Sequence, residues 1–200
     1  MMHRYPLYST FRGICAAVIM ILFRLKAAGQ ENIPKRGGFL IASNHVSYLD
    51  PVAVGVACPR PLNYMARHDL FKNAASSFIL RHSRAFPVKR KSADLGALKE
   101  ALRRLKNGDG LLVFPEGSRQ ENIHLSEAEA GVGFLAAKAG VPVVPAFVSG
   151  TDRALSRDAK FIKLATEIRV RFGKQIHIEG RMPYQDIAQI IMDSIRHLSC

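Results

Sequence analysis

Short apolar runs alternate with helix-like segments along most of this chain, and this alternation constrains the fold more than any other feature. Runs rich in Val, Ile, Leu and Phe predict buried strands at residues 39–43, 62–66, 86–89, 111–114 and 143–148. Helices are expected at residues 51–57, 70–80, 93–106 and 128–139, followed by a strand at 166–172 and a helix at 184–198. Such an order predicts an α/β fold, a layered mixed sheet flanked by helices, with polar motif residues at the strand ends.

Length and composition are typical of a single domain. The chain has 200 residues, of which 48% are hydrophobic, and this is enough for a core that needs no covalent or metal staples. Its cysteines are Cys15, Cys58 and Cys200, an odd number with neither paired nor metal-type spacing. That pattern indicates a reducing compartment and argues against a disulfide framework or a zinc site.

The charge of the chain is its strongest compositional anomaly. A net charge of +13 and an isoelectric point near 10.1 indicate an anionic partner, which could be a membrane, an acidic carrier protein, a phosphorylated substrate or a nucleic acid. The absence of Trp and of any recognised nucleic-acid motif argues against the last of these. No nucleic acid is therefore expected as a partner.

An unbroken apolar block occupies residues 13–23, between Arg12 on one side and Arg24 and Lys26 on the other. It is too short to span a bilayer, which needs about 20 residues. The basic residues that follow it also make it a poor secretory signal. We expect residues 1–28 to form a helix that lies in the interface of an anionic membrane, and residues 29–200 to form the main domain. The alternative is a buried core helix.

A histidine and an aspartate lie five residues apart, at His45 and Asp50, directly after the predicted strand at 39–43. Five steps of about 100° cannot place both side chains on one face of a helix, so the segment between them must turn. Pro51 suits the first position of a helix and Asp50 suits its N-cap, which would bring the carboxylate back toward the imidazole. On these residues alone, a structural histidine and a simple helix cap remain an alternative.

A second polar segment follows the apolar strand predicted at 111–114. In it, Gly117 allows the backbone to approach a ligand closely, and Arg119 offers a planar guanidinium suited to phosphate. The alternative is a tight turn with a structural ion pair between Glu116 and Arg119. Arg90, at the end of the strand predicted at 86–89, is a candidate second phosphate ligand.

Together these segments resemble the glycerolipid acyltransferases, the 1-acylglycerol-3-phosphate acyltransferase family. The first and third motifs of that family are matched by Asn44-His45-x4-Asp50 and by Phe114-Pro115-Glu116-Gly117-Ser118-Arg119. Its second and fourth motifs are matched by Ala85-Phe86-Pro87-Val88-Lys89-Arg90 and by Val141-Pro142-Val143-Val144-Pro145-Ala146. The blocks occur in order, and the resemblance covers roughly residues 28 to 150.

The resemblance implies transfer of a fatty acyl group from acyl-CoA or acyl carrier protein to the hydroxyl of a lysophosphatidate-like acceptor, forming phosphatidate. His45 would act as general base and Asp50 would orient it, so no Ser or Cys nucleophile and no cofactor or metal is required. Substrate binding would fall to Arg90, Glu116, Gly117, Ser118 and Arg119. An enzyme of this kind is expected at the cytoplasmic face of a membrane.

Two alternatives remain beside this interpretation. Residues 127–130 read Glu-Ala-Glu-Ala where the family usually has a basic residue before Gly131, so the acceptor could be another lyso-lipid. Lyso-ornithine lipid, other lysophospholipids and glycerol 3-phosphate all belong to this set. The other alternative is a basic membrane- or nucleic-acid-binding module without catalysis, in which His45 and Arg119 are structural.

Overall fold

A single mixed sheet organises the molecule, as the sequence predicted. The computed structural model describes residues 6–89, 94–117, 129–155 and 161–199. Seven strands pair in the order β1-β7-β6-β2-β5-β3-β4, and every pair is parallel except β6 with β7. The strands are β1 (Arg24–Ala28), β2 (Phe39–Ser43), β3 (Leu62–Arg67), β4 (Ala85–Val88), β5 (Gly110–Val113), β6 (Val143–Ser149) and β7 (Glu167–Phe172).

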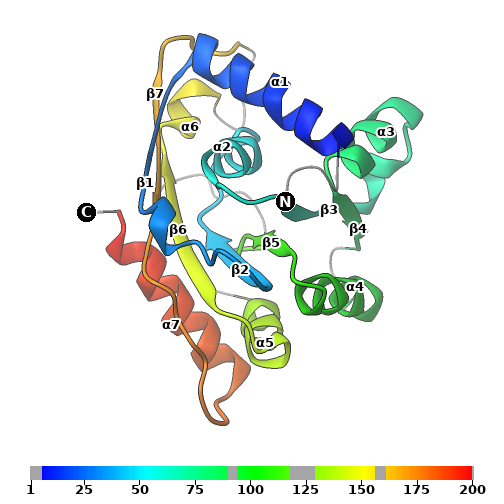
Figure 1. Ribbon diagram of the computed structural model, residues 1–200, viewed down its shortest axis with the longest axis vertical. Coiled ribbons are helices and arrows are strands. Elements are labelled where there is room, and N and C mark those ends of the chain that lie inside the picture. The colour runs from blue at the N-terminus through cyan, green and yellow to red at the C-terminus, as the bar shows by residue number, and fades with distance from the viewer. Residues whose placement is uncertain (1–5, 90–93, 118–128, 156–160, 200) are drawn as a thin grey trace.

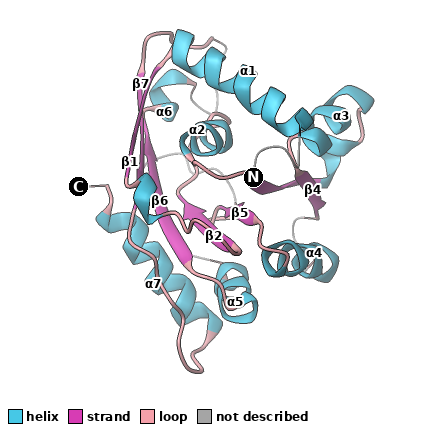
Figure 2. Cartoon of the chain, in the orientation of Figure 1, coloured by secondary structure: helices cyan, strands magenta, loops and turns pink. Residues whose placement is uncertain are grey.

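Helices cover both faces of this sheet (Figures 1 and 2). The α-helices are α1 (Pro6–Leu22), α2 (Asp50–Ala57), α3 (Ala74–His82), α4 (Leu95–Lys106), α5 (Ala130–Ala139), α6 (Thr151–Ala154) and α7 (Tyr184–His197). Two short 3-10 helices are η2 (Gln30–Asn32) and η3 (His68–Phe71). Figure 1 places α1, α2 and α3 on one side of the sheet and α4, α5 and α7 on the other.

The central strands are apolar throughout because both of their faces are buried. In β2, Leu40 and Ala42 pack into the cluster that contains α4, α5 and α7, whereas Phe39 and Ile41 pack into the cluster that contains α1 and α2. This is the period-two alternation of an extended strand. The continuous apolar sequence of β2 therefore contributes side chains to two hydrophobic clusters, one on each face of the sheet.

One helix predicted from the sequence, at residues 70–80, proved to be two elements. The structure has η3 up to Phe71 and α3 from Ala74, with Asn73 between them. The side chain of Asn73 accepts hydrogen bonds from the N–H groups of Ala75 and Ser76, so this residue caps a new helix and is not inside an older one. A second difference is β1, a strand that the sequence pattern did not predict, which pairs with β7.

Helix α1 packs on the domain along one side and faces solvent along the other. Tyr8 and Ile19 are buried, and α1 contacts α2, α3 and β1. Within the described ranges, no helix is both long enough and apolar enough to cross a bilayer. The buried side of α1 agrees with the alternative of a core helix, and the expectation of a membrane-interface helix stays a prediction.

Arg12 does not have the role of a free membrane-facing charge that the sequence suggested. Its guanidinium donates to the carbonyl oxygens of Gly55 and Val56 at 3.1 Å each and of Cys58 at 2.7 Å. These carbonyls lie at the C-terminal end of α2, where carbonyl groups have no hydrogen-bond partners within the helix. This end of a helix also carries a partial negative charge. Arg12 therefore ties α1 to the helix that begins at Asp50.

We predict that Arg12→Ala lowers the free energy of unfolding by about 1.5–3 kcal/mol, the typical contribution of hydrogen bonds to a charged group. Arg24→Ala is the matched control, because Arg24 is exposed on β1 and its truncation should change stability by less than about 0.5 kcal/mol. Chemical denaturation of both variants measures the difference. Equal effects would contradict the role assigned to Arg12.

Candidate functional site

The turn between β2 and α2 brings His45 and Asp50 into direct contact. His45 Nδ1 lies 2.9 Å from Asp50 Oδ2. The same carboxylate oxygen accepts from the backbone N–H groups of Val46 and Ser47, at 2.7 Å each. Asp50 is fully buried, so these donors replace the water that Oδ2 has lost, whereas Oδ1 has no hydrogen-bond partner among the described residues.

The expectation that Asp50 is the N-cap of α2 was wrong. Leu49 occupies that position, and Asp50 is the first residue of the helix, ahead of Pro51. The carboxylate of Asp50 makes no capping bond to its own helix and points back over the turn instead. The pairing with His45 that the sequence predicted is correct, but its cause is the turn and not a helix cap.

The geometry of His45 is suited to proton transfer. A carboxylate at Nδ1 favours the tautomer with its hydrogen on that atom, which leaves Nε2 as a base. The imidazole stacks on the ring of Phe114, with centroids 4.0 Å apart and planes inclined by 17°. These two contacts hold the ring in place. It still reaches solvent, because 14% of the side chain is accessible.

The neighbouring polar side chains of this turn are structural. Asn44 exchanges two hydrogen bonds with the backbone of Val148, donating from Nδ2 at 2.9 Å and accepting at Oδ1 at 2.7 Å. Ser47 donates from its hydroxyl to the carbonyl of Leu155 at 2.7 Å. These bonds fix the turn against β6 and α6, and they engage Ser47 in a way that does not suit a nucleophile.

Glu116 joins the second polar segment to the turn that carries His45 and Asp50. Strands β2 and β5 are parallel neighbours, so the segments that follow them emerge at the same edge of the sheet. Glu116 Oε2 accepts from the backbone N–H of His45 at 3.3 Å. Its other oxygen, Oε1, is buried and has no hydrogen-bond partner among the described residues.

Burial raises the pKa of Glu116 to about 7. The bond from the His45 N–H opposes this effect, and the nearby Asp50 carboxylate adds to it. Desolvation disfavours the charged form of a carboxyl group, which explains the direction of the shift. The sequence alternative that pairs Glu116 with Arg119 is not tested, because Arg119 lies outside the described residues.

Gly117 follows with a backbone φ of +64°, the left-handed conformation that glycine adopts at little cost. A β-carbon at this position would collide with the carboxylate of Glu129. Glu129 also donates its backbone N–H to the carbonyl of Pro115 at 2.8 Å. Reasoning from the sequence missed this neighbour of Gly117, although the acidic stretch at 127–130 was the available signal.

Three of the predicted substrate-binding residues cannot be placed. Arg90, Ser118 and Arg119 fall in ranges that the structure does not describe, so their roles stay predictions. Glu116 and Gly117 are described and lie next to His45 and Glu129 respectively. Among the described residues, no group of three or more His, Cys, Asp or Glu side chains could hold a metal ion.

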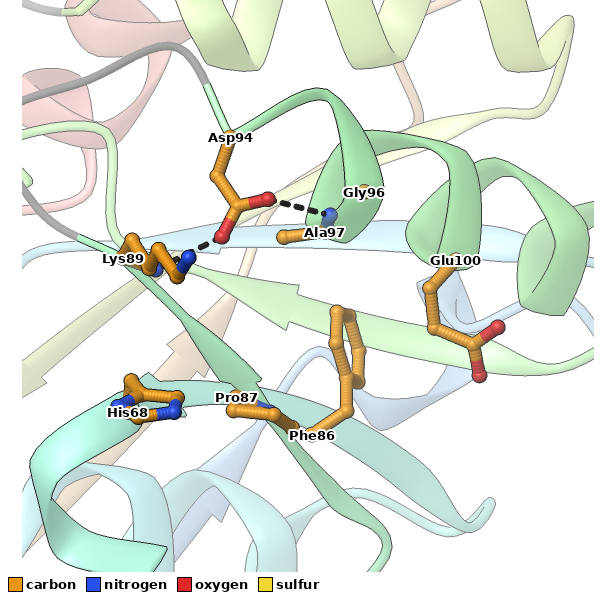
Figure 3. A pocket seen from close by; sticks show the side chains of 8 residues that line it. All are labelled: His68, Phe86, Pro87, Lys89, Asp94, Gly96, Ala97 and Glu100. Atoms are coloured by element: carbon orange, nitrogen blue, oxygen red, sulfur yellow. Dashed lines mark hydrogen bonds between the residues drawn. The ribbon is translucent and has the colours of Figure 1, made fainter.

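A pocket of about 300 Å³ opens beside β4 and the start of α4 (Figure 3), and His45 is not among the residues that line it. It is lined by His68, Phe86, Pro87, Lys89, Asp94, Gly96, Ala97 and Glu100. Asp94 lies at its edge and accepts from the backbone N–H groups of Lys89 and Ala97, at 2.9 and 3.0 Å. The pocket therefore adjoins the predicted second motif and not the His45–Asp50 pair.

We predict that the free energy of unfolding of Glu116→Gln increases relative to that of the wild type as the pH is raised from about 4.5 to about 7. In that window the folded wild type retains a proton that the unfolded chain releases, so its free energy of unfolding falls with rising pH. A shift of about 2.5 pKa units corresponds to a full loss of about 3.5 kcal/mol, at about 1.4 kcal/mol per unit, and the glutamine variant avoids this loss. Denaturation of both proteins at the same pH values cancels other titrating groups. A pH-independent difference would contradict the raised pKa.

Comparisons with known proteins agree with this arrangement. A family model described as "Acyltransferase" matches residues 24–149. The 1-acyl-sn-glycerol-3-phosphate acyltransferase of Bacillus subtilis is 32% identical over 142 residues, covering 68% of this chain and 70% of that protein. The enzyme of the same name from Streptococcus pneumoniae is 26% identical over 183 residues, covering 86% and 67%.

The fold also has a counterpart among solved structures. The crystal structure of the 1-acyl-sn-glycerophosphate acyltransferase from Thermotoga maritima aligns with a TM-score of 0.77 at 20% identity, covering 96% of this chain and 80% of that one. The family match extends over more than half of the chain and includes the His45–Asp50 turn and the segment at 114–119. The chain belongs to the acyltransferase family.

Proposed function

We propose that this protein transfers a fatty acyl group from an acyl thioester to the free hydroxyl of 1-acylglycerol 3-phosphate, forming phosphatidate. The observation that carries the proposal is the 2.9 Å bond between His45 Nδ1 and Asp50 Oδ2 inside the first motif of the family. The similarity to two enzymes named for this acceptor supports the substrate. The acyl donor is either coenzyme A thioester or acyl carrier protein.

In the proposed mechanism, His45 Nε2 removes the proton of the acceptor hydroxyl as its oxygen attacks the thioester carbonyl. A C–O bond forms and a tetrahedral intermediate results. The intermediate collapses with cleavage of the C–S bond, and the imidazolium returns its proton to the departing thiolate. Asp50 holds the ring in position and stabilises the transient imidazolium, as the carboxylate of a Ser-His-Asp triad does.

The acceptor phosphate would bind beyond β5 and β4. Arg119 is the proposed principal ligand, with Arg90 as a second, because a guanidinium can bind two phosphate oxygens at once. Gly117 keeps the backbone before Arg119 free of a side chain. Ser118 is a proposed hydrogen-bond donor to the same group.

One observation favours a second candidate acceptor. Glu129 is exposed and its carboxylate lies against Gly117, so a negative charge stands beside the proposed phosphate site. Such a charge repels phosphate and attracts a cation. A lyso-lipid whose head group carries an amine, such as lyso-ornithine lipid, would suit this position better than lysophosphatidate does.

We also propose that the enzyme works at the cytoplasmic face of an anionic membrane. The outward side of α1 carries exposed Leu7, Ile14, Val18 and Ile21, which could enter the interface. Deleting α1 is a poor test of this idea because Tyr8, Arg12 and Ile19 support the domain. Point substitutions on the exposed side are the better tool.

Incubation of the purified protein with a panel of lyso-lipids tests the acceptor. Each lyso-lipid is offered with an acyl-CoA and with an acyl carrier protein thioester, and products are identified by mass. Phosphatidate as the main product supports the proposal, whereas a product from an amine-bearing lyso-lipid alone supports the second candidate. No product with any acceptor would overturn both and would revive the non-catalytic binding module.

We predict that His45→Ala lowers kcat by about 10²–10⁴-fold, the usual contribution of a general base, without changing the free energy of unfolding greatly. Asp50→Asn should also lower kcat, and it should cost about 1–3 kcal/mol of stability because the N–H groups of Val46 and Ser47 lose an anionic acceptor. Steady-state kinetics and denaturation separate the two effects. Retained turnover in a folded His45→Ala variant would exclude the assigned base.

We predict that Arg119→Ala raises the KM of the phosphate-bearing acceptor more than that of the acyl donor. Arg119→Lys should restore little of the loss, because an ammonium group cannot reproduce the planar two-point contact. Arg90→Ala should show the same bias more weakly. Equal increases for both substrates would point to a structural role for Arg119.

A further inference from the structure

Exposed large apolar side chains are concentrated on α1 and on two segments beside its ends. On α1 they are Leu7, Ile14, Val18, Met20 and Ile21. The other segments contribute Leu70, Phe78 and Ile79 from η3 and α3, and Phe161, Ile162 and Leu164 from the residues before β7. Scattered apolar residues on a surface are ordinary, but a contiguous group of them marks an interaction site.

On α1, four of the five exposed residues and the half-buried Phe11 form a stripe along the helix; Met20 lies outside this stripe. Leu7, Phe11, Ile14 and Val18 follow each other at spacings of four, three and four, which places them on one face. Ile14 and Val18 are 57% and 45% exposed, whereas Ile19, about 100° further round the helix from Val18, is 2% exposed. The stripe is therefore separate from the face that α1 uses for the core.

Aromatic contacts continue this stripe onto α3. The ring of Phe11 lies 6.3 Å from that of His82, and His82 in turn lies 4.0 Å from the ring of Phe78. Phe78 is 57% exposed and its neighbour Ile79 is 50% exposed. The N-terminal half of α1 and the outer side of α3 thus form one surface, and Figure 1 shows the two helices side by side.

Backbone hydrogen bonds hold the chain just before β7 at the C-terminal end of α1. The N–H of Ala165 donates to the carbonyl of Leu22 at 2.8 Å, and the N–H of Arg24 donates to Thr166 at 3.1 Å. These bonds hold Ala165 and Thr166 at the end of α1, and residues 161–164 directly precede them; the N–H of Lys163 donates to the carbonyl of Ala154 in α6 at 2.8 Å. Phe161 is 83% exposed there, more than any other large apolar residue of the described chain.

The charges around this surface indicate its partner. Lys72, Arg81 and Lys163 are exposed and adjoin the apolar side chains of η3, α3 and the segment at 161–164. The chain as a whole carries a net charge of +13. Apolar side chains rimmed by cations match the acyl boundary and anionic head groups of a lipid leaflet.

We propose that the membrane-docking surface of this protein extends beyond α1, onto α3 at one end and onto residues 161–164 at the other, and that an anionic lipid leaflet covers all three. The inference rests on the proposed membrane association and adds two contacts to it. A domain that is held at an interface by one helix can still tilt about the axis of that helix. Contacts at three places fix the orientation of the sheet, and with it the direction from which a lipid reaches His45.

The chain contains no Trp, so a single introduced Trp reports its own surroundings. Full-length Phe78→Trp and Phe161→Trp are mixed with vesicles of phosphatidylcholine and phosphatidylglycerol, with or without brominated acyl chains. Ile14→Trp is the reference for α1. Leu95→Trp is the matched control, because Leu95 is 65% exposed but lies on α4, across the sheet from α1 in Figure 1.

We expect the emission of the probes at 14, 78 and 161 to shift to the blue and to lose at least half its intensity with brominated lipid, while the probe at 95 changes little. If the emission of the probe at 78 or at 161 changed as little as that of the probe at 95, the proposal would be overturned and α1 would remain as the docking element. Shifts caused by acyl carrier protein or by concentrating the protein, without lipid, would overturn it in favour of a protein interface.

Activity toward a short-chain acceptor below its micelle concentration separates this proposal from the proposed function. Phe78→Asp combined with Ile79→Asp should reduce vesicle binding at least tenfold and leave that soluble activity within about twofold of the wild type. Leu95→Asp should reduce vesicle binding less than twofold. Normal vesicle binding by the double variant would overturn the docking surface, whereas inactivity of the wild type itself would count against the proposed function alone.

Discussion

One buried carboxylate oxygen organises the candidate active site. Asp50 Oδ2 is hydrogen-bonded to His45 Nδ1 and accepts hydrogen bonds from the backbone N–H groups of Val46 and Ser47. Two backbone donors hold the carboxylate in a fixed position, so the imidazole is oriented by the same contact that shapes the turn. Any movement of Asp50 would therefore displace both the backbone of the turn and the imidazole of His45.

Parallel strand pairing supplies the rest of the site. Ala42 of β2 lies opposite Val113 of β5, so the segments that follow these strands start at the same height on one edge of the sheet. The stacking of His45 on Phe114 and the bond from its N–H to Glu116 follow from that register. Residues about 70 positions apart in the chain become neighbours with no long-range device other than the sheet.

Some of the many basic residues of the chain bind acceptors inside the domain, and others are exposed on its surface. Arg12 binds the carbonyls at the end of α2, and Arg84 is buried with an ion pair to Asp109 at 2.8 Å. Arg104 bonds to Asn63 and to the backbone of Arg84. These guanidinium groups satisfy buried acceptors and do not contribute to a free basic face. The cations left at the surface include Lys72 and Arg81, beside η3 and α3, and Lys163.

The sequence by itself determined the α/β class, most strand positions, the pairing of His45 with Asp50 and the family, because apolar periodicity and short motifs are local properties of the chain. Only the tertiary structure decided that β1 joins the sheet, that Arg12 binds the carbonyls at the end of α2 and that Glu129 lies against Gly117. Each of these depends on contacts between distant segments. A polar side chain carries no local signal of which distant partner it will meet, and burial fixes that partner only when the sheet and its helices have assembled.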